Sequence, residues 1–260
     1  MNLLITVNYN NSELTNKMIE SILADDLDII VVDNNSNDKS ILNQTSNIEY
    51  IFLKENIGYF PALNIGLKKV NIKDYDYIII CNNDLKFSSD FFTILYKKLF
   101  PDNVYAVCPR ILDLDNVDQN PMLDKKISKF KVFFYDLYYK NYYLGQFLYN
   151  VWQKIKQKRI TVNLEHRQVF MGYGAIYILT KNFFKKNLEL ETPPFLMFEE
   201  TFLAHQIYES GGIEFFDSDL LVYHQDHSTC SKVPRKQMYD ICKESYAGFR
   251  ARIFKIPSLV

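Results

Sequence analysis

The chain has 260 residues, enough for one large domain or two small ones with a sizeable core. Hydrophobic residues make up 48% of it, which excludes an intrinsically disordered protein. The formal net charge is −1, which argues against a uniformly basic nucleic-acid-binding protein.

The cysteines and the apolar segments bear on the compartment. Cys81, Cys108, Cys230 and Cys242 show no CxxC or zinc-type spacing, which favours a reduced protein without structural disulfides. The N-terminus has no basic region and only a short apolar run, so a signal peptide is not expected. No uncharged apolar stretch approaches the roughly 20 residues that span a bilayer. We expect a cytoplasmic protein, either soluble or held at the inner face of the plasma membrane without crossing it.

The first part of the chain alternates apolar runs with helical patterns. Buried strands are predicted at residues 3–8, 29–33, 48–53 and 77–81. Helices are predicted between them at residues 14–23, with Ser12 as N-cap, and at residues 61–70. The alternation indicates right-handed βαβ crossovers and an α/β fold with a mostly parallel central sheet flanked by helices.

Each predicted strand ends in Asn, Asp or Gly. For one strand end alone, an ordinary polar turn explains these residues equally well. Together they predict a shared crevice, because ligands bind at the carboxyl ends of strands in an open α/β sheet. Asp33 is placed to pair with a base or ribose. Asn82, Asn83 and Asp84 offer oxygen ligands to a hard divalent cation that can hold a diphosphate.

Two common nucleotide-binding motifs are absent from the sequence. No G-x-G-x-x-G follows the first strand, and no G-x-x-x-x-G-K-[ST] occurs anywhere. A dinucleotide-binding Rossmann domain and a P-loop NTPase are therefore not expected.

Four short motifs follow one another in the order of the predicted strands. They are V-N-Y-N at 7–10, V-V-D-N-N-S-N-D at 31–38, N-I-G-Y at 56–59 with N-I-G at 64–66, and N-N-D at 82–84. Together they resemble the signature of family-2 glycosyltransferases, most closely the rhamnosyltransferase-like branch that builds bacterial surface polysaccharides. The resemblance implies a GT-A fold and transfer of a sugar from a nucleotide diphosphate donor.

The resemblance also implies roles for individual residues. The nucleoside would be held by Asn8, Tyr9, Asn10, Asp33, Asn34, Asn35 and Ser36. Asn56 and Gly58 would line the path of the sugar diphosphate. The segment 82–84 takes the place of the family's Asp-x-Asp metal motif. Because Asn82 replaces the first acid, Asp84 would be the main ligand of Mg²⁺ or Mn²⁺. His224 would be the second, with His227 a weaker choice.

The next stretch is less informative. Residues 88–100 predict a helix capped by Ser88 or Ser89, and residues 104–109 a strand stopped by proline. Residues 113–124 are polar. Their acids are spaced somewhat like a calcium loop, but the central Gly and final Glu are missing, so we expect a solvated loop.

Residues 125–159 combine positive charge with aromatic side chains. They contain nine Lys or Arg and one acid, a net charge of +8 that leaves −9 for the remainder, and eleven aromatic residues. Their apolar positions fall at helical spacing. A basic amphipathic helix pair with interfacial aromatics suits the surface of an anionic bilayer. A helical insertion packed on the domain, with a solvated basic face, and single-stranded nucleic-acid binding by stacking stay open.

The last part returns to strand and helix character. Residues 170–178 predict a strand, with Gly172 allowing close approach to a ligand. Glu199 and Glu200 begin a helix to 210, where adjacent acids are favourable dipole partners in any protein. The resemblance implies that one is the catalytic base, with Glu200 favoured. In the same helix Phe202 replaces an acid of the family.

Gln206 stands where the family's helix has an arginine. The helix ends at the glycines 211–212. Short strands are predicted at residues 214–216 and 220–223, and a closing helix at residues 234–254.

These observations predict a single GT-A domain, with a nucleotide-sugar-binding half (1–110), the helical insertion (111–168) and an acceptor and catalytic half (169–260). The predicted activity is inverting transfer to a glycan or lipid-linked acceptor in capsule or O-antigen synthesis. Two alternatives stay open. One is a non-catalytic scaffold of a polysaccharide assembly complex, with Asn82 marking a decayed metal site. The other is a nucleotidyltransferase, which would need a basic, Gly-rich loop after the first strand.

Overall fold

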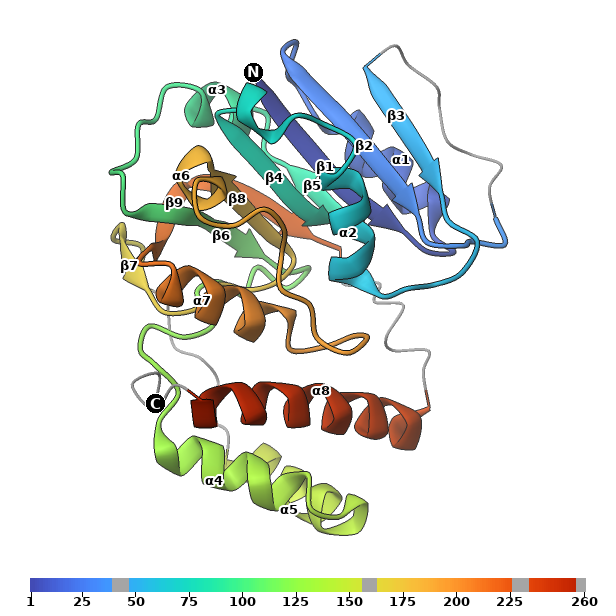
Figure 1. Cartoon of the computed structure of the whole chain (residues 1–260), viewed down its shortest axis with the longest axis vertical. Helices are drawn as coiled ribbons and strands as arrows, with labels where there is room; N and C mark the ends of the chain where they lie inside the picture. The colour runs from blue at the N-terminus through green and yellow to red at the C-terminus, as the bar shows by residue number, and fades with distance from the viewer. Residues whose placement is uncertain (39–46, 156–162, 226–233, 256–260) are drawn as a thin grey trace.

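A nine-stranded β-sheet forms the centre of the protein in the computed structural model, which describes residues 1–38, 47–155, 163–225 and 234–255. The strand order is β3-β2-β1-β4-β8-β6-β9-β5, and β7 pairs with β9 (Figure 1). The strands are β1 Asn2–Asn8, β2 Leu27–Asp33, β3 Ile48–Phe52, β4 Tyr77–Asn82, β5 Leu85–Phe87, β6 Val104–Leu112, β7 Arg167–Val169, β8 Ile176–Thr180 and β9 Ile213–His224.

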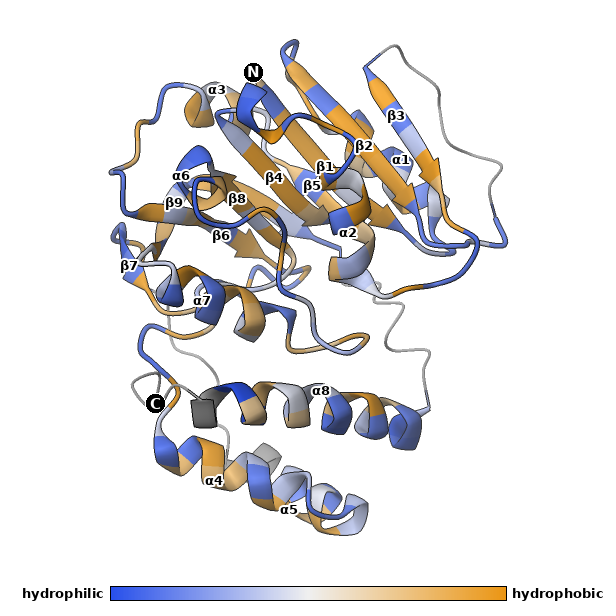
Figure 2. Ribbon diagram, viewed as in Figure 1, coloured by the Kyte–Doolittle hydropathy of each residue, from blue (hydrophilic) through white to orange (hydrophobic). Residues whose placement is uncertain are grey.

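Helices cover both faces of this sheet and extend beyond it. They are α1 Ser12–Glu20, α2 Tyr59–Leu67, α3 Phe91–Leu95, α4 Lys129–Tyr138, α5 Tyr142–Ile155, α6 Lys181–Phe184, α7 Glu199–Glu209 and α8 Arg235–Lys255, with a 3₁₀ turn at Ile72–Asp74. One core lies between the sheet and α2, α6 and α7, and a second lies between the opposite face and α1 and α3. The sheet is buried on both faces, and most positions of its central strands are apolar (Figure 2).

The first four strands pair as the sequence predicts. β1 lies between β2 and β4, and β2 pairs with β3, all in parallel. The register places Asn8 opposite Asp33, and Val7 opposite Asn82. The polar ends of these strands therefore meet at one edge of the sheet.

The sheet is mixed rather than mostly parallel. β8 runs antiparallel to both β4 and β6, and β5 and β7 run antiparallel to β9. The predicted parallel pairing therefore holds for β1–β4 and for β6 with β9, and the other four pairs are antiparallel. The chain enters β8 at the edge where β1, β2 and β4 end, so β8 must run antiparallel to β4. The apolar run at 170–178 gives no indication of strand direction.

Several predicted boundaries are also wrong. The helix at 88–100 is only α3, and Ser12 is the first residue of α1, with Asn11 as its N-cap. The runs 214–216 and 220–223 form one strand, β9. Pro109 does not end β6, because it sits at a register shift against β9, where a residue without an N–H is tolerated.

The predicted helical insertion forms a layer with α8 beyond α7, at the end of the molecule farthest from the sheet (Figure 1). Ser128 caps α4 by accepting a hydrogen bond from the Lys131 N–H. A third core joins α4, α7 and α8 through Val132, Phe202 and Phe249. The insertion therefore packs on the domain through one face, as one of the predicted alternatives requires.

Among the described residues, no helix has both the length and the apolar character needed to span a membrane. Cys81, Cys108 and Cys242 are in no disulfide, and Cys230 lies outside the described residues.

Candidate active site

Asn8 lies at the centre of a hydrogen-bonded cluster at the ends of β1 and β2. Its Nδ2 donates to Asp33 Oδ2 at 2.8 Å, and to the hydroxyls of Ser12 and Ser36 at 3.2 Å. Its Oδ1 accepts from the Thr15 hydroxyl at 2.9 Å. The Asn8 side chain is fully buried. It ties the two strand ends together.

The loops after these strands are held by side chains as well. The Asn10 N–H donates to the Ser36 hydroxyl at 2.8 Å, and Asn10 and Asn35 both adopt positive φ. Asn34 donates to Asn56 Oδ1 at 2.8 Å and to the Gly58 carbonyl at 3.0 Å. The second and third strand ends are therefore connected.

Gly58 is required at its position. It has a φ of 92°, and a Cβ there would lie 2.1 Å from the Phe195 carbonyl oxygen. The residue is buried. Gly58 thus brings the start of α2 against the segment that leads into α7.

The predicted nucleoside-binding residues separate into two groups by exposure. Asn8, Asp33, Asn34 and Ser36 are buried and are bonded to one another or to neighbouring loops. Tyr9, Asn10 and Asn35 are half-buried or exposed. The buried group shapes the strand ends, and the exposed group is accessible to a ligand. The sequence pattern does not distinguish them because both kinds have the same residue types.

Asp84 joins this cluster through its neighbour and pairs with His224. Asn83 Nδ2 donates to the Thr15 hydroxyl at 2.8 Å and to Asn8 Oδ1 at 3.3 Å. Asp84 Oδ1 lies 3.2 Å from His224 Nε2, and both side chains are less than 10% exposed. The predicted metal ligands are thus adjacent. His227 lies outside the described residues.

Gln119 orients His224. Its Oε1 lies 2.8 Å from His224 Nδ1, which places the proton on Nδ1 and leaves the lone pair of Nε2 facing Asp84. Asp84 Oδ1 has no hydrogen-bond partner although it is buried. A buried carboxylate oxygen and an imidazole nitrogen that face each other without a shared proton fit a divalent cation between them.

The loop between β7 and β8 connects the strand ends to α7. The Asn82 N–H donates to the Ala175 carbonyl at 2.8 Å, and the Gly174 N–H donates to Glu200 Oε1 at 3.2 Å. The ring of Tyr173 lies 5.8 Å from that of His224, centroid to centroid. Asp84, His224 and Glu200 are therefore gathered around this loop.

The two glutamates begin α7 after two residues with left-handed backbone. Met197 and Phe198 have φ values of 71° and 70°, a conformation that costs non-glycine residues about 1–3 kcal/mol and is concentrated at functional sites. Burial and the nearby Glu200 carboxylate raise the pKa of Glu199 to about 8. Burial also raises the pKa of Glu200, which is half-buried.

Three residues with buried titratable groups near this pair were not predicted from the sequence. The hydroxyls of Tyr59 and Tyr177 have no hydrogen-bond partner, and nearby carboxylates add to the effect of burial in raising the pKa of each. For Tyr59, burial comes first, and the charges of Cys81, Glu199, Asp84 and Glu200 raise the pKa further. The third residue is Glu214. Tyr59 ends the N-I-G-Y motif, but no role was predicted for it. Tyr177 and Glu214 stand in no motif, and only the buried polar position in an apolar strand marks Glu214.

Two predicted residues have internal roles instead. The Gly172 N–H donates to Glu214 at 2.7 Å, and a Cβ at Gly172 would lie 2.5 Å from Cys108 Sγ. The close approach at Gly172 is therefore to the core and not to a ligand. Gln206 accepts from the Glu191 N–H and donates to the Glu189 carbonyl, so it holds the segment before α7.

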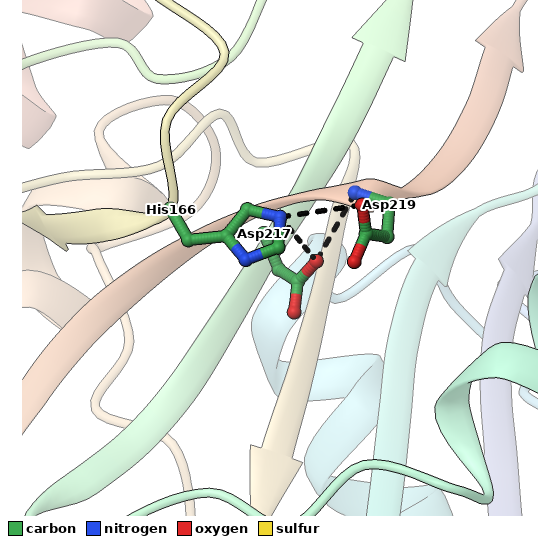
Figure 3. Close-up of side chains that lie close together, drawn as sticks. All are labelled: His166, Asp217 and Asp219. Carbon is green, nitrogen blue, oxygen red and sulfur yellow. Dashed lines mark hydrogen bonds and ion pairs between the residues drawn. The ribbon is translucent and has the colours of Figure 1, made fainter.

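A second acidic cluster lies elsewhere on β9, next to the start of β7. His166, Asp217 and Asp219 approach one another there (Figure 3). The Lys98 ammonium already bonds both carboxylates, at 2.6 Å to Asp217 and 2.8 Å to Asp219. A cation would have to displace this lysine, so we assign the cluster to structure.

Two surface hollows lie beside the strand ends rather than over them. A groove of about 760 Å³ separates α2 from residues 187–192, and another of about 540 Å³ lies along Lys126 and Tyr208. Neither is lined by Asp33, Asp84 or Glu200. Hydrogen bonds connect the segments that carry these acids: Asn8 bonds both Asp33 and Asn83, and Gly174 bonds Glu200.

Solved structures share this fold. TarS 1-349 of S. aureus in complex with UDP-GlcNAc aligns with a TM-score of 0.57 at 12% identity, over 98% of this chain and 73% of that one. GalNAc-T7 with UDP, GalNAc and Mn²⁺ aligns with a TM-score of 0.57 at 11% identity, over 88% of this chain and 44% of that one. The predicted GT-A-like α/β fold is confirmed, with a mixed sheet.

No curated protein matches the sequence. The family model described as Glycosyl transferase family 2 matches residues 3–186, which include the ends of β1, β2 and β4. This match covers more than half of the chain, and the motifs that it spans are those that meet in the structure. The chain therefore belongs to glycosyl transferase family 2.

Proposed function

We propose that the protein is an inverting glycosyltransferase that uses Asp84 and His224 for the donor diphosphate and Glu200 as general base. The observation that carries this proposal is the contact network at the edge where the family's motifs converge: Asp84 Oδ1 lies 3.2 Å from His224 Nε2, and the loop that accepts from the Asn82 N–H donates from Gly174 to Glu200 Oε1. Inverting transfer needs an activated leaving group and a base for the acceptor. Asp84 and His224 would serve the leaving group by holding a cation, and Glu200 would be the base.

The donor would be a nucleotide diphosphate sugar. Tyr9, Asn10 and Asn35 are less buried than the other predicted nucleoside-binding residues at the ends of β1 and β2, and we propose that they contact the nucleoside. Asn56 lies on the path from there toward α2. UDP-GlcNAc in TarS and UDP in GalNAc-T7 favour a uridine nucleotide. Hexosyl and deoxyhexosyl donors are both compatible with this arrangement.

A divalent cation fits Asp84 Oδ1, which accepts no hydrogen bond, and the neighbouring Nε2 of His224. We propose that these residues hold Mg²⁺ or Mn²⁺, with Asn82 and Asn83 nearby. When bound there, the cation offsets negative charge on the leaving diphosphate. Gln119 would keep His224 in the tautomer that ligation requires.

Glu200 would take the acceptor proton. The Gly174 N–H holds its Oε1, which leaves Oε2 for the proton of the acceptor hydroxyl. As that oxygen forms a bond to the anomeric carbon, the bond to the diphosphate breaks and the anomeric configuration inverts. Burial raises the pKa of Glu200, which makes the carboxylate a stronger base near neutral pH.

We propose that the acceptor is a glycan or a lipid-linked glycan in the synthesis of a bacterial surface polysaccharide, consistent with the rhamnosyltransferase-like motifs. Transfer would take place in the cytoplasm, at the inner face of the plasma membrane. The protein would bind this face without crossing it.

A donor screen tests the proposal. A panel of nucleotide sugars is added with Mn²⁺, and thermal stability is recorded; we expect at least one donor to raise the melting temperature. Hydrolysis of that donor without acceptor then separates an enzyme from a scaffold. A donor that binds but is neither hydrolysed nor transferred would support the scaffold, and a panel without any binder would refute both.

A further inference from the structure

Helix α4 is apolar on two opposite faces. Its inner face packs Val132, Tyr135 and Tyr139 into the core shared with α7 and α8. Its outer face exposes Phe130 and Phe133, at 70% and 58% of their surface. Phenylalanines grouped on the solvent side of a helix do not pack into the core, and such a group indicates an interaction site.

Helix α5 continues this exposed apolar character. Tyr143, Phe147 and Val151 are spaced four residues apart, so they share one face, and they are 80%, 63% and 40% exposed. The helix packs against α4. We refer to the six exposed side chains of the two helices as the α4–α5 surface: Phe130, Phe133, Phe134, Tyr143, Phe147 and Val151.

The charge around the α4–α5 surface is positive. Lys125, Lys129 and Lys140 are exposed along α4. The one acid of the segment, Asp136, is neutralised by Arg250, whose Nε and Nη2 bond its two oxygens at 2.8 and 3.0 Å. Exposed aromatic rings with lysines on the same helical layer match an interface with anionic phospholipid headgroups.

We propose that the α4–α5 surface binds the protein to an anionic bilayer, with its aromatic rings at the headgroup level and its lysines on the lipid phosphates. A second copy of the chain is disfavoured because a symmetric contact would set these lysines against themselves. Single-stranded nucleic acid favours a basic groove along its backbone, whereas these rings stand on outward helix faces.

Helix α4 carries part of the α4–α5 surface on one face and contacts the start of α7 with the other. The rings of Tyr135 and Tyr139, on the inner face of α4, each lie 6.2 Å from the ring of Phe198. Phe198 directly precedes Glu199 and Glu200. Membrane binding here would bring a lipid-linked acceptor close to α7, and this last step alone rests on the proposed function.

Vesicle cosedimentation tests the proposal. The full chain is mixed with vesicles of phosphatidylcholine alone, or of equal parts phosphatidylcholine and phosphatidylglycerol, without any donor. We expect binding to the anionic vesicles only. Binding should fall when salt is raised from about 0.1 M to about 1 M, because the Debye length shrinks from about 10 Å to about 3 Å.

Two pairs of matched variants assign the contact. The triple variant Phe130→Ser, Phe133→Ser, Phe147→Ser should weaken vesicle binding at least about tenfold. The variant Leu23→Ser, Leu99→Ser removes exposed leucines elsewhere and should bind normally.

The charge variants follow the same design. Lys129→Glu with Lys140→Glu should abolish the preference for anionic vesicles, and Lys69→Glu with Lys97→Glu, at exposed positions outside the insertion, should keep it. All four positions are on the surface, so the variants are expected to fold, which circular dichroism checks.

Three results would overturn the proposal. The first is equal binding to both vesicle types or undiminished binding by the triple variant. The second is a wild-type dimer in light scattering that the triple variant loses. The third is tight binding to oligouridine that the triple variant loses. Because no donor is present, failure of the proposed sugar transfer leaves these results unchanged.

Discussion

Glu199 and Glu200 are adjacent in sequence but differ in environment. Glu199 is 7% exposed, one of its oxygens has no partner, and burial together with Glu200 raises its pKa to about 8. A carboxyl that keeps its proton at neutral pH cannot accept another. Glu200 is half-buried and has one oxygen held by Gly174, so it is the better base.

We therefore expect Glu200→Gln to lower kcat by about 10²–10⁴-fold while donor affinity is retained. Glu199→Gln should change kcat much less, because it replaces one neutral group by another. Steady-state kinetics and calorimetric donor titration measure the two quantities. Loss of turnover in Glu199→Gln with normal turnover in Glu200→Gln would reverse the assignment.

Glu214 makes stability depend on pH. Burial raises its pKa from an ordinary 4.5 to about 8. Below about pH 4.5 both the folded and the unfolded chain hold the proton, and the group costs nothing. As pH rises toward 8, the unfolded chain loses the proton and the folded chain keeps it. Stability therefore falls across this range.

Glu214→Gln removes this dependence. The free energy of unfolding of the variant, relative to wild type, should rise by at least about 1 kcal/mol between about pH 5 and about pH 8. Urea denaturation at the two pH values measures it, with Glu20→Gln on the exposed side of α1 as control. An equal difference at both pH values would show that Glu214 is ionised in the folded protein.

The residue types of the site could be predicted, but their accessibility could not. Strand ends in a parallel sheet converge, and this placed Asn8, Asp33 and Asp84 together. Whether a side chain reaches a ligand depends on how neighbouring loops fold over it. Asn8 is fully buried and Asn10 is exposed, although they are two residues apart in one motif. Glu214 and Gln119 belong to no motif, and only the packed structure brings them in.

At the scale of elements, α7 is positioned by an aromatic cluster. The ring of Phe198 lies 5.9 Å from that of Tyr246 and 6.0 Å from that of Phe249, both on α8. Tyr135 and Tyr139 contact it from α4. These contacts hold the left-handed backbone that directs α7, so the insertion supports the site without contributing a reacting group.

Phe198→Ala should release this constraint. We expect kcat to fall by about 10- to 100-fold, because small displacements of a base are costly, while donor affinity stays unchanged. Tyr138→Ala is the matched control, since its ring packs on Tyr139 and Tyr239 in the same layer. Stability and kcat are measured for both variants. Equal losses of kcat would mean that Phe198 acts only through stability.

The elements themselves were predictable where their signal is local. The four parallel strands have long apolar runs and clear polar ends, and they were found. The direction of β8 and the length of β9 depend on partners far away in sequence. Pro109 indicated the end of a strand, but the register shift against β9 accommodates it.

At the scale of the whole molecule, the positive segment belongs to the helical layer. The sheet lies at one end of the long axis, the layer of α4, α5 and α8 lies at the other, and α7 lies between them (Figure 1). The segment 125–159 carries +8 and the remainder −9. This division orients the molecule on an anionic surface, with the helical layer toward the lipid.

The account depends most on one claim: Asp84, at the end of β4, binds a donor diphosphate through a cation in the site that Glu200 serves as base. Calorimetric titration of UDP, with and without Mn²⁺, tests it directly in wild type, Asp84→Ala and Glu200→Gln. We predict Mn²⁺-dependent binding in wild type and Glu200→Gln and its loss in Asp84→Ala. Undiminished, Mn²⁺-dependent binding of UDP by Asp84→Ala would contradict the claim.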